Sequence, residues 1–196
     1  MEPTPLIIIL GPPATGKTTL GRRLAADLRL PFLGRDDFKE RLFDRLGWRD
    51  REWSRQLGMA SWDLLWHAVE CQLAAGKAAI AESNFNGPIA TATVRELATR
   101  YDFAPVQINC VTAGAVLVER HRRRAESGER HPGHVDTLES VRAELRDTLL
   151  RGRYEPLAIG GRTIEVDTTD FAALDYDGLL ATLREAHPPL RDAGHR

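Results

Sequence analysis

Cysteine is scarce in this chain of 196 residues. Its two cysteines, Cys71 and Cys110, lie in apolar stretches, and their spacing is that of neither a metal site nor a disulfide framework. The sequence therefore gives no sign of a fold held together by disulfides or by thiolate-bound metal. We expect a reducing, cytoplasmic setting.

Long hydrophobic runs and an excess of charge are also lacking. Residues 1–10 hold no basic region and only five consecutive aliphatic residues, which is too short for a signal peptide or a membrane span. With 27 basic and 28 acidic residues the net charge is −1, so the chain has no general attraction to nucleic acid or anionic lipid. We expect no membrane partner and do not favour nucleic acid, because only residues 120–130 form a local basic patch.

Internal repeats and low-complexity tracts are absent from the sequence. Its hydrophobic content of 42% is enough for one substantial core, so we expect a single domain over residues 1–186. The remaining residues, 187–196, carry two prolines and mixed charge, which is typical of a flexible tail.

Short apolar runs alternate with stretches of helical periodicity along the chain. The runs predict strands at residues 6–10, 31–33, 78–81, 105–111 and 163–166. The periodic stretches predict helices at residues 17–28, 52–75, 89–101, 137–150 and 176–186. Asp36 or Asp37 is expected to cap a further helix that ends near residue 46, and Thr112 another that enters the arginine-rich stretch. The alternation predicts an α/β fold, a doubly wound five-stranded parallel sheet with a small helical lid at about residues 120–136.

A glycine-containing segment links the first expected strand to the first expected helix. Residues 11–18 read Gly-Pro-Pro-Ala-Thr-Gly-Lys-Thr, which fits the phosphate-loop pattern G-x-x-x-x-G-K-[ST]. The glycines let successive backbone N–H groups face an anion, Lys17 reaches the β- and γ-phosphates, and the Thr18 hydroxyl ligates Mg²⁺. The expected cofactors are therefore ATP and Mg²⁺. The residues expected to bind them are Gly11, Pro12, Pro13, Ala14, Thr15, Gly16, Lys17, Thr18 and Thr19.

Four blocks of sequence resemble a known family, the small P-loop kinases. They are residues 11–18, Gly-Arg-Asp-Asp-Phe-Lys-Glu at 34–40, Glu-Ser-Asn-Phe at 82–85 and Gly-Glu-Arg-His-Pro-Gly-His at 128–134. The family includes polynucleotide kinase, gluconate kinase, chloramphenicol phosphotransferase, the zeta-toxin kinases and bacterial proteins labelled AAA-family ATPases. The resemblance extends over most of the chain and implies a nucleotide-kinase-like P-loop fold that transfers phosphate to an alcohol group.

Two carboxylates follow the second expected strand, where the carboxyl ends of parallel strands line a ligand crevice. A carboxylate there can accept the proton of an attacking hydroxyl or orient that hydroxyl toward the γ-phosphorus. The similar block of polynucleotide kinase implies that Asp36 is the catalytic carboxylate, which leaves Asp37 as the helix cap. Lys39 stands where the family often has an arginine, so it is a candidate substrate contact without the bidentate grip of a guanidinium.

Glu82 ends the third expected strand, where P-loop proteins carry an acidic residue that holds the Mg²⁺ shell through water. Together with Thr18 it forms the expected metal site, and a plain solvated glutamate is the alternative. Asn84 follows in a polar loop, where it can bind a substrate hydroxyl or serve only the turn. Four aromatic side chains can stack on an acceptor ring or belong to the core, namely Trp48, Trp53, Trp62 and Trp66.

Arginines gather before and within the expected lid. Arg120 and Arg124 lie four residues apart and so share a helix face, and Arg130 follows in a loop. An arginine that closes from a lid stabilises the charge of a transferring phosphoryl group. The expected catalytic residues are therefore Lys17, Asp36, Arg124 and Arg130. Arg122 and Arg123 fit a solvated basic face equally well.

These residues predict an ATP-dependent phosphotransferase that moves the γ-phosphate to a hydroxyl of a small molecule or nucleotide. One alternative is a polynucleotide 5′-hydroxyl kinase, which the Arg-Asp-Asp resemblance favours and the neutral net charge opposes. The other is a non-catalytic ATP-binding regulatory protein, which would have no need of Asp36. A GTPase is not indicated, because residues 167–170 lack the lysine of the base-reading motif. The sequence specifies neither the acceptor nor the oligomeric state.

Overall fold

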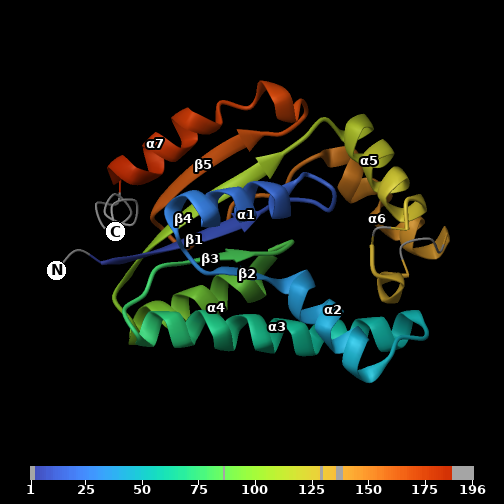
Figure 1. The fold of residues 1–196 in the computed structure, drawn as a ribbon, viewed down its shortest axis with the longest axis horizontal. Helices are drawn as coiled ribbons and strands as arrows, with labels where there is room; N and C mark the ends of the chain where they lie inside the picture. Colours follow the sequence, from blue (N-terminus) through green and yellow to red (C-terminus); the bar gives the residue numbers. More distant parts are fainter. Residues whose placement is uncertain (1–2, 86, 129, 136–138, 187–196) are drawn as a thin grey trace.

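The computed structural model describes residues 3–85, 87–128, 130–135 and 139–186 (Figure 1). Its centre is a sheet of five strands in the order β2-β3-β1-β4-β5, and every neighbouring pair is parallel. The strands are β1 (Thr4–Leu10), β2 (Phe32–Gly34), β3 (Ala79–Glu82), β4 (Phe103–Val111) and β5 (Arg162–Asp167). The predicted α/β fold with a five-stranded parallel sheet is confirmed.

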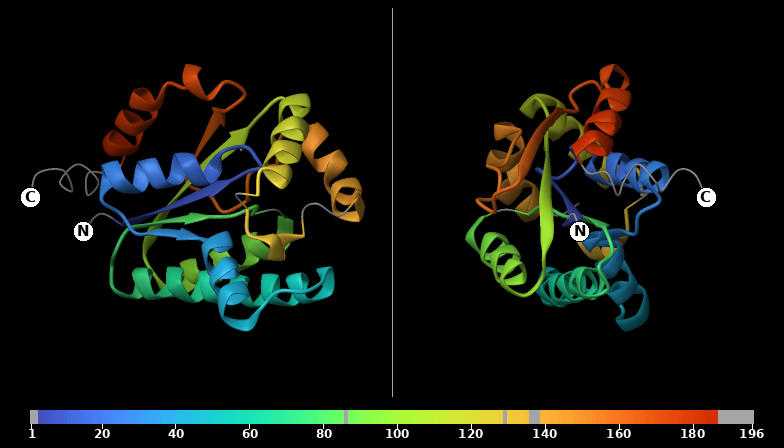
Figure 2. Two further views of the ribbon diagram at one scale, coloured as in Figure 1. Left: turned by 45° about the vertical axis from the view of Figure 1, so that its right-hand side comes forward. Right: turned by 90° about the vertical axis from the view of Figure 1, so that its left-hand side faces the viewer.

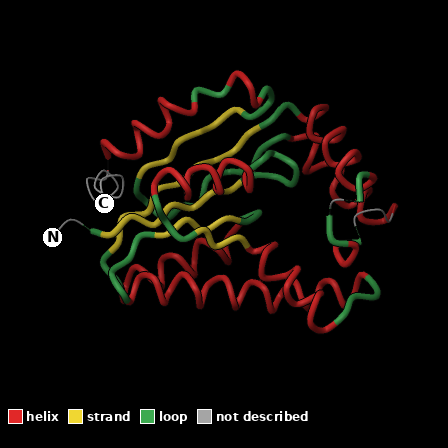
Figure 3. The backbone as a smooth tube through the Cα atoms, viewed as in Figure 1, coloured by secondary structure: helices red, strands yellow, loops and turns green. Residues whose placement is uncertain are grey.

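Helices cover both faces of the sheet (Figure 2), and the strands form one layer between them (Figure 3). Helices α1 (Lys17–Leu28) and α7 (Tyr176–Ala186) pack on one face, and α3 (Arg51–Ala74) and α4 (Gly87–Arg100) pack on the other. Alternate side chains of β1 serve the two cores, since Ile7 and Ile9 face α1 and α7 while Ile8 faces α3 and α4. Residues 6–10 are all fully buried, which explains why this strand reads as an uninterrupted apolar run.

The predicted cap of the second helix is wrong. Helix α2 (Arg35–Leu46) follows β2 without a linking loop, so its N-cap is Gly34 and no side chain caps it. Asp36 and Asp37 instead lie in the first turn, where the positive end of the helix dipole favours carboxylates. Asp37 forms an exposed ion pair of 2.6 Å with Arg22 of α1.

The predicted cap at Thr112 is wrong as well. Helix α5 (Gly114–Glu126) has Ala113 as its N-cap and no side-chain cap bond. The Thr112 hydroxyl is buried and lies 2.6 Å from the hydroxyl of Thr168. Because Thr112 still stands at the end of β4, beside the end of β5, its hydroxyl pairs across the two strands and not with the helix.

Two helices and a short 3₁₀ turn lie beyond the carboxyl ends of the strands (Figure 1). They are α5, η1 (Pro132–His134) and α6 (Glu139–Arg151). This is the region of the expected lid, although residues 129 and 136–138 lie outside the described part of the chain, as does the expected tail at 187–196. None of the helices in the described ranges is long and apolar enough to cross a membrane.

The turn η1 packs on α2 through an aromatic contact centred on Phe43. Phe43 of α2 is 1% exposed and stacks on His131 with ring centroids 5.0 Å apart, while His134 meets its edge at 5.4 Å. Gly133 lies directly on the ring, so that a Cβ at this position would be 2.7 Å from Phe43 carbons. The packing ties the segment 130–134 to the helix that carries Asp36.

We predict that Gly133→Ala lowers the free energy of unfolding by about 1–3 kcal/mol, because the added methyl overpacks the contact with Phe43. Urea denaturation measures the loss, and limited proteolysis at residues 130–134 reports the undocking. The same change in a Phe43→Leu background should cost less, since the smaller side chain leaves room. Equal stability of Gly133→Ala and the parent in both backgrounds would contradict the tight contact between Gly133 and Phe43.

Candidate active site

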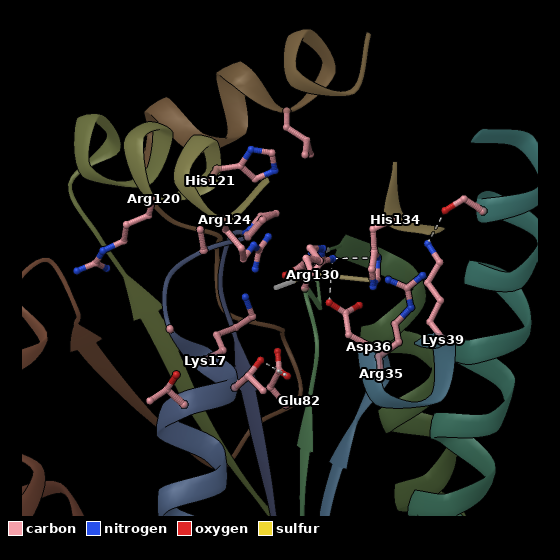
Figure 4. Close-up of a pocket in the computed structure, with 18 of the residues that line it drawn as sticks. Lys17, Arg35, Asp36, Lys39, Glu82, Arg120, His121, Arg124, Arg130 and His134 are labelled. Atoms are coloured by element: carbon pink, nitrogen blue, oxygen red, sulfur yellow. Dashed lines mark hydrogen bonds and ion pairs between the residues drawn. The ribbon is translucent and has the colours of Figure 1, made fainter. Parts of the chain in front are cut away.

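A cavity of about 560 Å³ opens at the carboxyl ends of β1, β3 and β2 (Figure 4). The phosphate loop forms one wall, α2 and α3 form another, and α5, α6 and η1 cover it. Its cationic lining residues are Lys17, Arg35, Lys39, Arg51, Arg55, Arg120, Arg124 and Arg130. The carboxylates that line the cavity are Asp36, Glu82 and Glu144. Among the described residues that line the cavity, positive charge therefore outweighs negative charge, although the net charge of the chain is −1.

The phosphate loop has the backbone that its sequence pattern requires. Gly11 and Gly16 have φ values of 144° and 81°, which side chains disfavour, and a Cβ on Gly11 would be 2.4 Å from the carbonyl oxygen of Cys110. Ala14 also has a positive φ, 66°. Gly16 is the N-cap of α1, so the loop ends at the N-terminus of this helix. The free backbone N–H groups of a helix N-terminus bind anions.

Lys17 points into the loop that precedes it. Its Nζ donates to the carbonyl oxygen of Pro12 at 2.7 Å and to the Thr15 hydroxyl at 3.5 Å. Only 5% of the residue is exposed. Burial lowers the pKa of Lys17, and the nearby carboxylate of Glu82 partly offsets this effect. The ammonium is thus held beside the loop by polar groups of the chain.

Thr18 and Glu82 meet as the metal-site prediction requires. The Thr18 hydroxyl donates to Glu82 Oε2 at 3.0 Å, because β1 and β3 are adjacent and the phosphate loop returns over the end of β3. Among the described residues no group of three or more His, Cys, Asp or Glu side chains could hold a metal. One hydroxyl and one carboxylate beside a phosphate site fit Mg²⁺, which keeps several waters and takes other ligands from phosphates.

Asp36 lies across the cavity from Lys17 and is engaged by Arg130. The Asp36 Oδ2 to Arg130 Nη2 distance is 3.1 Å, and the carboxylate faces the cavity with 42% of its side chain exposed. Loss of water contact raises the pKa of Asp36, but Arg130 and the other nearby cations together lower this pKa more. The pKa of Asp36 therefore lies below its ordinary value. Asp36 is therefore ionised at neutral pH and able to accept a hydrogen bond.

A histidine holds Arg130 in this position. His134 Nδ1 is 3.0 Å from Arg130 Nη2, and His134 Nε2 is 2.9 Å from Glu40 Oε1. Because a guanidinium only donates, Nδ1 must accept, and the proton of the neutral ring therefore sits on Nε2 and is donated to Glu40. Figure 4 shows Asp36, Arg130 and His134 in contact. With Glu40 they form a chain that begins and ends on α2 and passes through Arg130 and His134 of the cover.

The arginines of α5 separate into two groups. Arg124 lines the cavity, where its charge acts on both Lys17 and Asp36. Arg120 also lines it, and its guanidinium donates to the carbonyl oxygens of Thr168 and Thr169. Arg122 and Arg123, which the sequence left open, are exposed and bind Glu119 on the same helix.

The remaining expected contacts are only partly brought together. Lys39 and Asn84 line the cavity, and Lys39 donates to the Ser54 hydroxyl at 3.0 Å. The four tryptophans do not line it. Trp62 and Trp66 instead pack against Phe85 of the core, with ring planes tilted by 52° and 45°.

Sequence reasoning missed several lining residues on α2, α3 and α6. They are Arg35, Arg51, Ser54, Arg55 and Glu144. Glu144 forms ion pairs with Arg51 and Arg55, which join α6 to α3. The four-residue spacing of Arg51 and Arg55, and of Arg35 and Lys39, was the available signal, since it places each pair on one helix face.

The fold and the phosphate loop define a P-loop kinase-like protein, and comparison with known sequences agrees. The profile of the AAA_33 family, described as an AAA domain, matches residues 6–148. The chain therefore belongs to this family. No curated protein matches the chain significantly.

Solved structures show the same relationship. A crystal structure described as a "putative kinase" from Chloroflexus aurantiacus J-10-fl is 44% identical, with a TM-score of 0.87 over 94% of this chain and 98% of that one. The fold is shared with a sugar kinase from Janibacter sp. HTCC2649, at 17% identity and a TM-score of 0.57 over 93% and 94% of the two chains. The fold is also shared with a gluconokinase from Sinorhizobium meliloti 1021, at 19% identity and a TM-score of 0.51 over 99% of this chain and 95% of that one. These findings confirm the resemblance to the small P-loop kinases.

We predict that acid weakens the docking of η1 through His134. Burial lowers the pKa of His134 below 6.5, Arg130 adds to this, and the hydrogen bond to Glu40 opposes it. The unfolded chain thus takes up this proton at higher pH than the folded chain. The contribution of His134 to stability is present above pH 6.5 and is lost as the pH falls through the folded pKa.

Urea denaturation at about pH 7.5 and about pH 5.5 measures this contribution, which should be on the order of 1 kcal/mol. His134→Gln should lose less stability than the parent protein over this interval. His67→Gln, at an exposed position of α3, is the control and should follow the parent. An identical pH dependence in His134→Gln and the parent would show that this imidazole is not the titrating group.

Proposed function

We propose that this chain is an ATP-dependent phosphotransferase that moves the γ-phosphate of ATP onto a hydroxyl of a small molecule or nucleotide. The observation that carries the proposal is the placement of Asp36 opposite the phosphate loop in one cavity. A protein that only binds nucleotide needs the loop but has no use for an ionised carboxylate at the place where an acceptor would enter. The kinases among its structural relatives support the same class of reaction.

The nucleotide side of the cavity is the phosphate loop with Lys17 and Arg124. Lys17 would exchange its hydrogen bond to the Pro12 carbonyl for oxygens of the β- and γ-phosphates. Arg124, which faces the same space from α5, would neutralise charge on the transferring phosphoryl group. Thr18 and Glu82 would hold Mg²⁺, which neutralises phosphate charge when bound.

The acceptor side of the cavity is the first turn of α2 with the residues facing it. Phosphoryl transfer through a loose transition state needs positioning and charge stabilisation more than a strong base. The low pKa of Asp36 suits this role, because an ionised carboxylate orients the attacking hydroxyl and takes its proton late. Arg130 bridges the two sides, since it contacts Asp36 from the cover of the cavity.

We predict that Lys17→Ala lowers phosphate transfer by at least about a hundredfold while the protein stays folded. The ammonium is buried at a cost, so its removal should not lower the melting temperature. Transfer is measured with γ-labelled ATP against nucleosides, sugars, aminoglycosides and 5′-hydroxyl oligonucleotides.

Lys77→Ala removes an exposed lysine and serves as the matched control for Lys17→Ala. Normal turnover of ATP by Lys17→Ala would contradict the assignment of the phosphate loop. Label on the oligonucleotides alone would favour the polynucleotide kinase alternative. ATP binding without transfer to any acceptor would favour the regulatory alternative.

We predict that Asp36→Asn lowers kcat by about a hundredfold or more and changes ATP affinity little, because the carboxylate acts on the acceptor hydroxyl. Steady-state kinetics and ATP binding by calorimetry separate the two effects. Asp37→Asn is the control, since its exposed pair with Arg22 contributes little stability and lies outside the cavity. A similar mild loss in both variants would show that Asp36 has no special part in transfer.

A further inference from the structure

A second cavity lies between α3 and α4. Its described lining residues come from residues 59–66 of α3 and 89–93 of α4, and none of them lines the active-site cavity. Its volume is about 370 Å³, which falls within the range of about 300–1,000 Å³ that is usual for small-molecule sites. The second cavity is therefore distinct from the candidate active site and large enough to hold a small molecule.

Two indole side chains line the second cavity and are held in place by other contacts. The rings of Trp62 and Trp66 are nearly parallel, with an angle of 17° between their planes and 6.3 Å between their centroids. Both rings pack against the fully buried ring of Phe85, at centroid distances of 5.4 and 5.3 Å. The Arg35 guanidinium also lies over Trp62, 4.5 Å from its centroid. Because packing already fixes these aromatic walls, a ligand would bind them at a low cost in conformational entropy.

Large apolar side chains at the second cavity are left in water. Met59 of α3 is 65% exposed and Ile89 of α4 is 82% exposed, which are the highest values among the large hydrophobic residues in the described ranges. Exposed apolar surface that gathers around a hollow is typical of a place where a ligand or partner binds. A ligand with an apolar body would remove these two side chains from water, which favours binding.

One charge distinguishes among the ligands that could enter. Asp63 is the one charged side chain among the described lining residues, and within the described ranges no hydrogen bond or ion pair engages its carboxylate. An anion would be repelled by this carboxylate, and a neutral apolar compound would cover it without replacing the water that it loses. A cation would pair with it, and indole rings attract cations as well. The lining therefore matches a ligand that is positively charged and otherwise apolar.

We propose that the second cavity is a binding site for a small organic cation with an apolar body. The cationic group pairs with the carboxylate of Asp63, and the apolar body lies against the indoles of Trp62 and Trp66. The same body covers the exposed side chains of Met59 and Ile89. The inference goes beyond the proposed function and does not depend on it, because the two cavities share no described lining residue.

Titration of the full chain with matched probes tests this site, and calorimetry and tryptophan fluorescence report the binding. The probes are benzyltrimethylammonium, which has both features, benzyl alcohol, which lacks the charge, phenylacetate, which reverses the charge, and tetramethylammonium, which lacks the ring. Benzyltrimethylammonium should bind at least about fivefold tighter than each of the other three. Its affinity should stay the same when Mg²⁺ and a non-hydrolysable ATP analogue are added, because the phosphate loop belongs to the other cavity.

Two variants at exposed positions separate the charge from the apolar contact, and neither removes a buried side chain. Asp63→Asn should weaken the binding of benzyltrimethylammonium by about fivefold and leave that of benzyl alcohol unchanged. Ile89→Ser should weaken the binding of both aromatic probes by about threefold, since it removes apolar contact. Asp102→Asn removes an exposed carboxylate outside both cavities, so it is the matched control and should bind all probes as the parent does.

Equal affinity for the cationic, neutral and anionic aromatic probes, or no binding of benzyltrimethylammonium, would overturn the proposed ligand class. Unchanged affinity in both Asp63→Asn and Ile89→Ser, or displacement by the ATP analogue, would show that the probe binds elsewhere. Sedimentation velocity tests the other occupant, a second copy of the chain. Dimers that form with rising concentration and are abolished by Ile89→Ser would assign the second cavity to that contact and overturn the proposal.

Discussion

The parallel pairing of β1 with β3, and of β3 with β2, is the constraint on which the candidate site depends. The register sets Glu82 opposite Ile9 on one side and Gly34 on the other, so the three segments leave the sheet at the same level. The phosphate loop, Glu82 and the first turn of α2 therefore reach one cavity from distant parts of the sequence. A slip of β3 by one residue would turn Glu82 to the opposite face and remove it from Thr18.

Packing and charge together position the cover of the cavity, which consists of α5, α6 and η1. Gly133 on the Phe43 ring sets the distance between η1 and α2 without using a charge. As a consequence of that contact, Arg130 lies beside Asp36. His134 likewise lies beside Glu40. Ion pairs join the cover to α3 as well, where Glu144 meets Arg51. Aromatic packing and ion pairs thus hold the cover over the cavity together.

Much of this arrangement follows from the sequence, and the reasons for the remainder are physical. The strands and the phosphate loop follow from local patterns, because a buried strand and a glycine loop constrain their own residues. The pairing of Thr18 with Glu82 follows from the expected adjacency of two parallel strand ends. The predicted cap at Asp37 failed because β2 runs directly into α2 and leaves no loop residue between them. The predicted cap at Thr112 failed because its hydroxyl pairs with that of Thr168, across the ends of β4 and β5. The approach of Arg35 to Gly58 depends on how two helices pack, and no local pattern encodes it.

The central place of β1 has a consequence for the order in which the molecule assembles. Both neighbours of β1 lie later in the chain, since β3 ends at Glu82 and β4 ends at Val111. The amino-terminal strand is therefore synthesised well before either of its partners, and parallel pairing across such separations is slow to form. Gly11, whose approach to the Cys110 carbonyl shapes the loop, cannot reach its final conformation until β4 has left the ribosome. The phosphate loop is thus translated before the strand that shapes it.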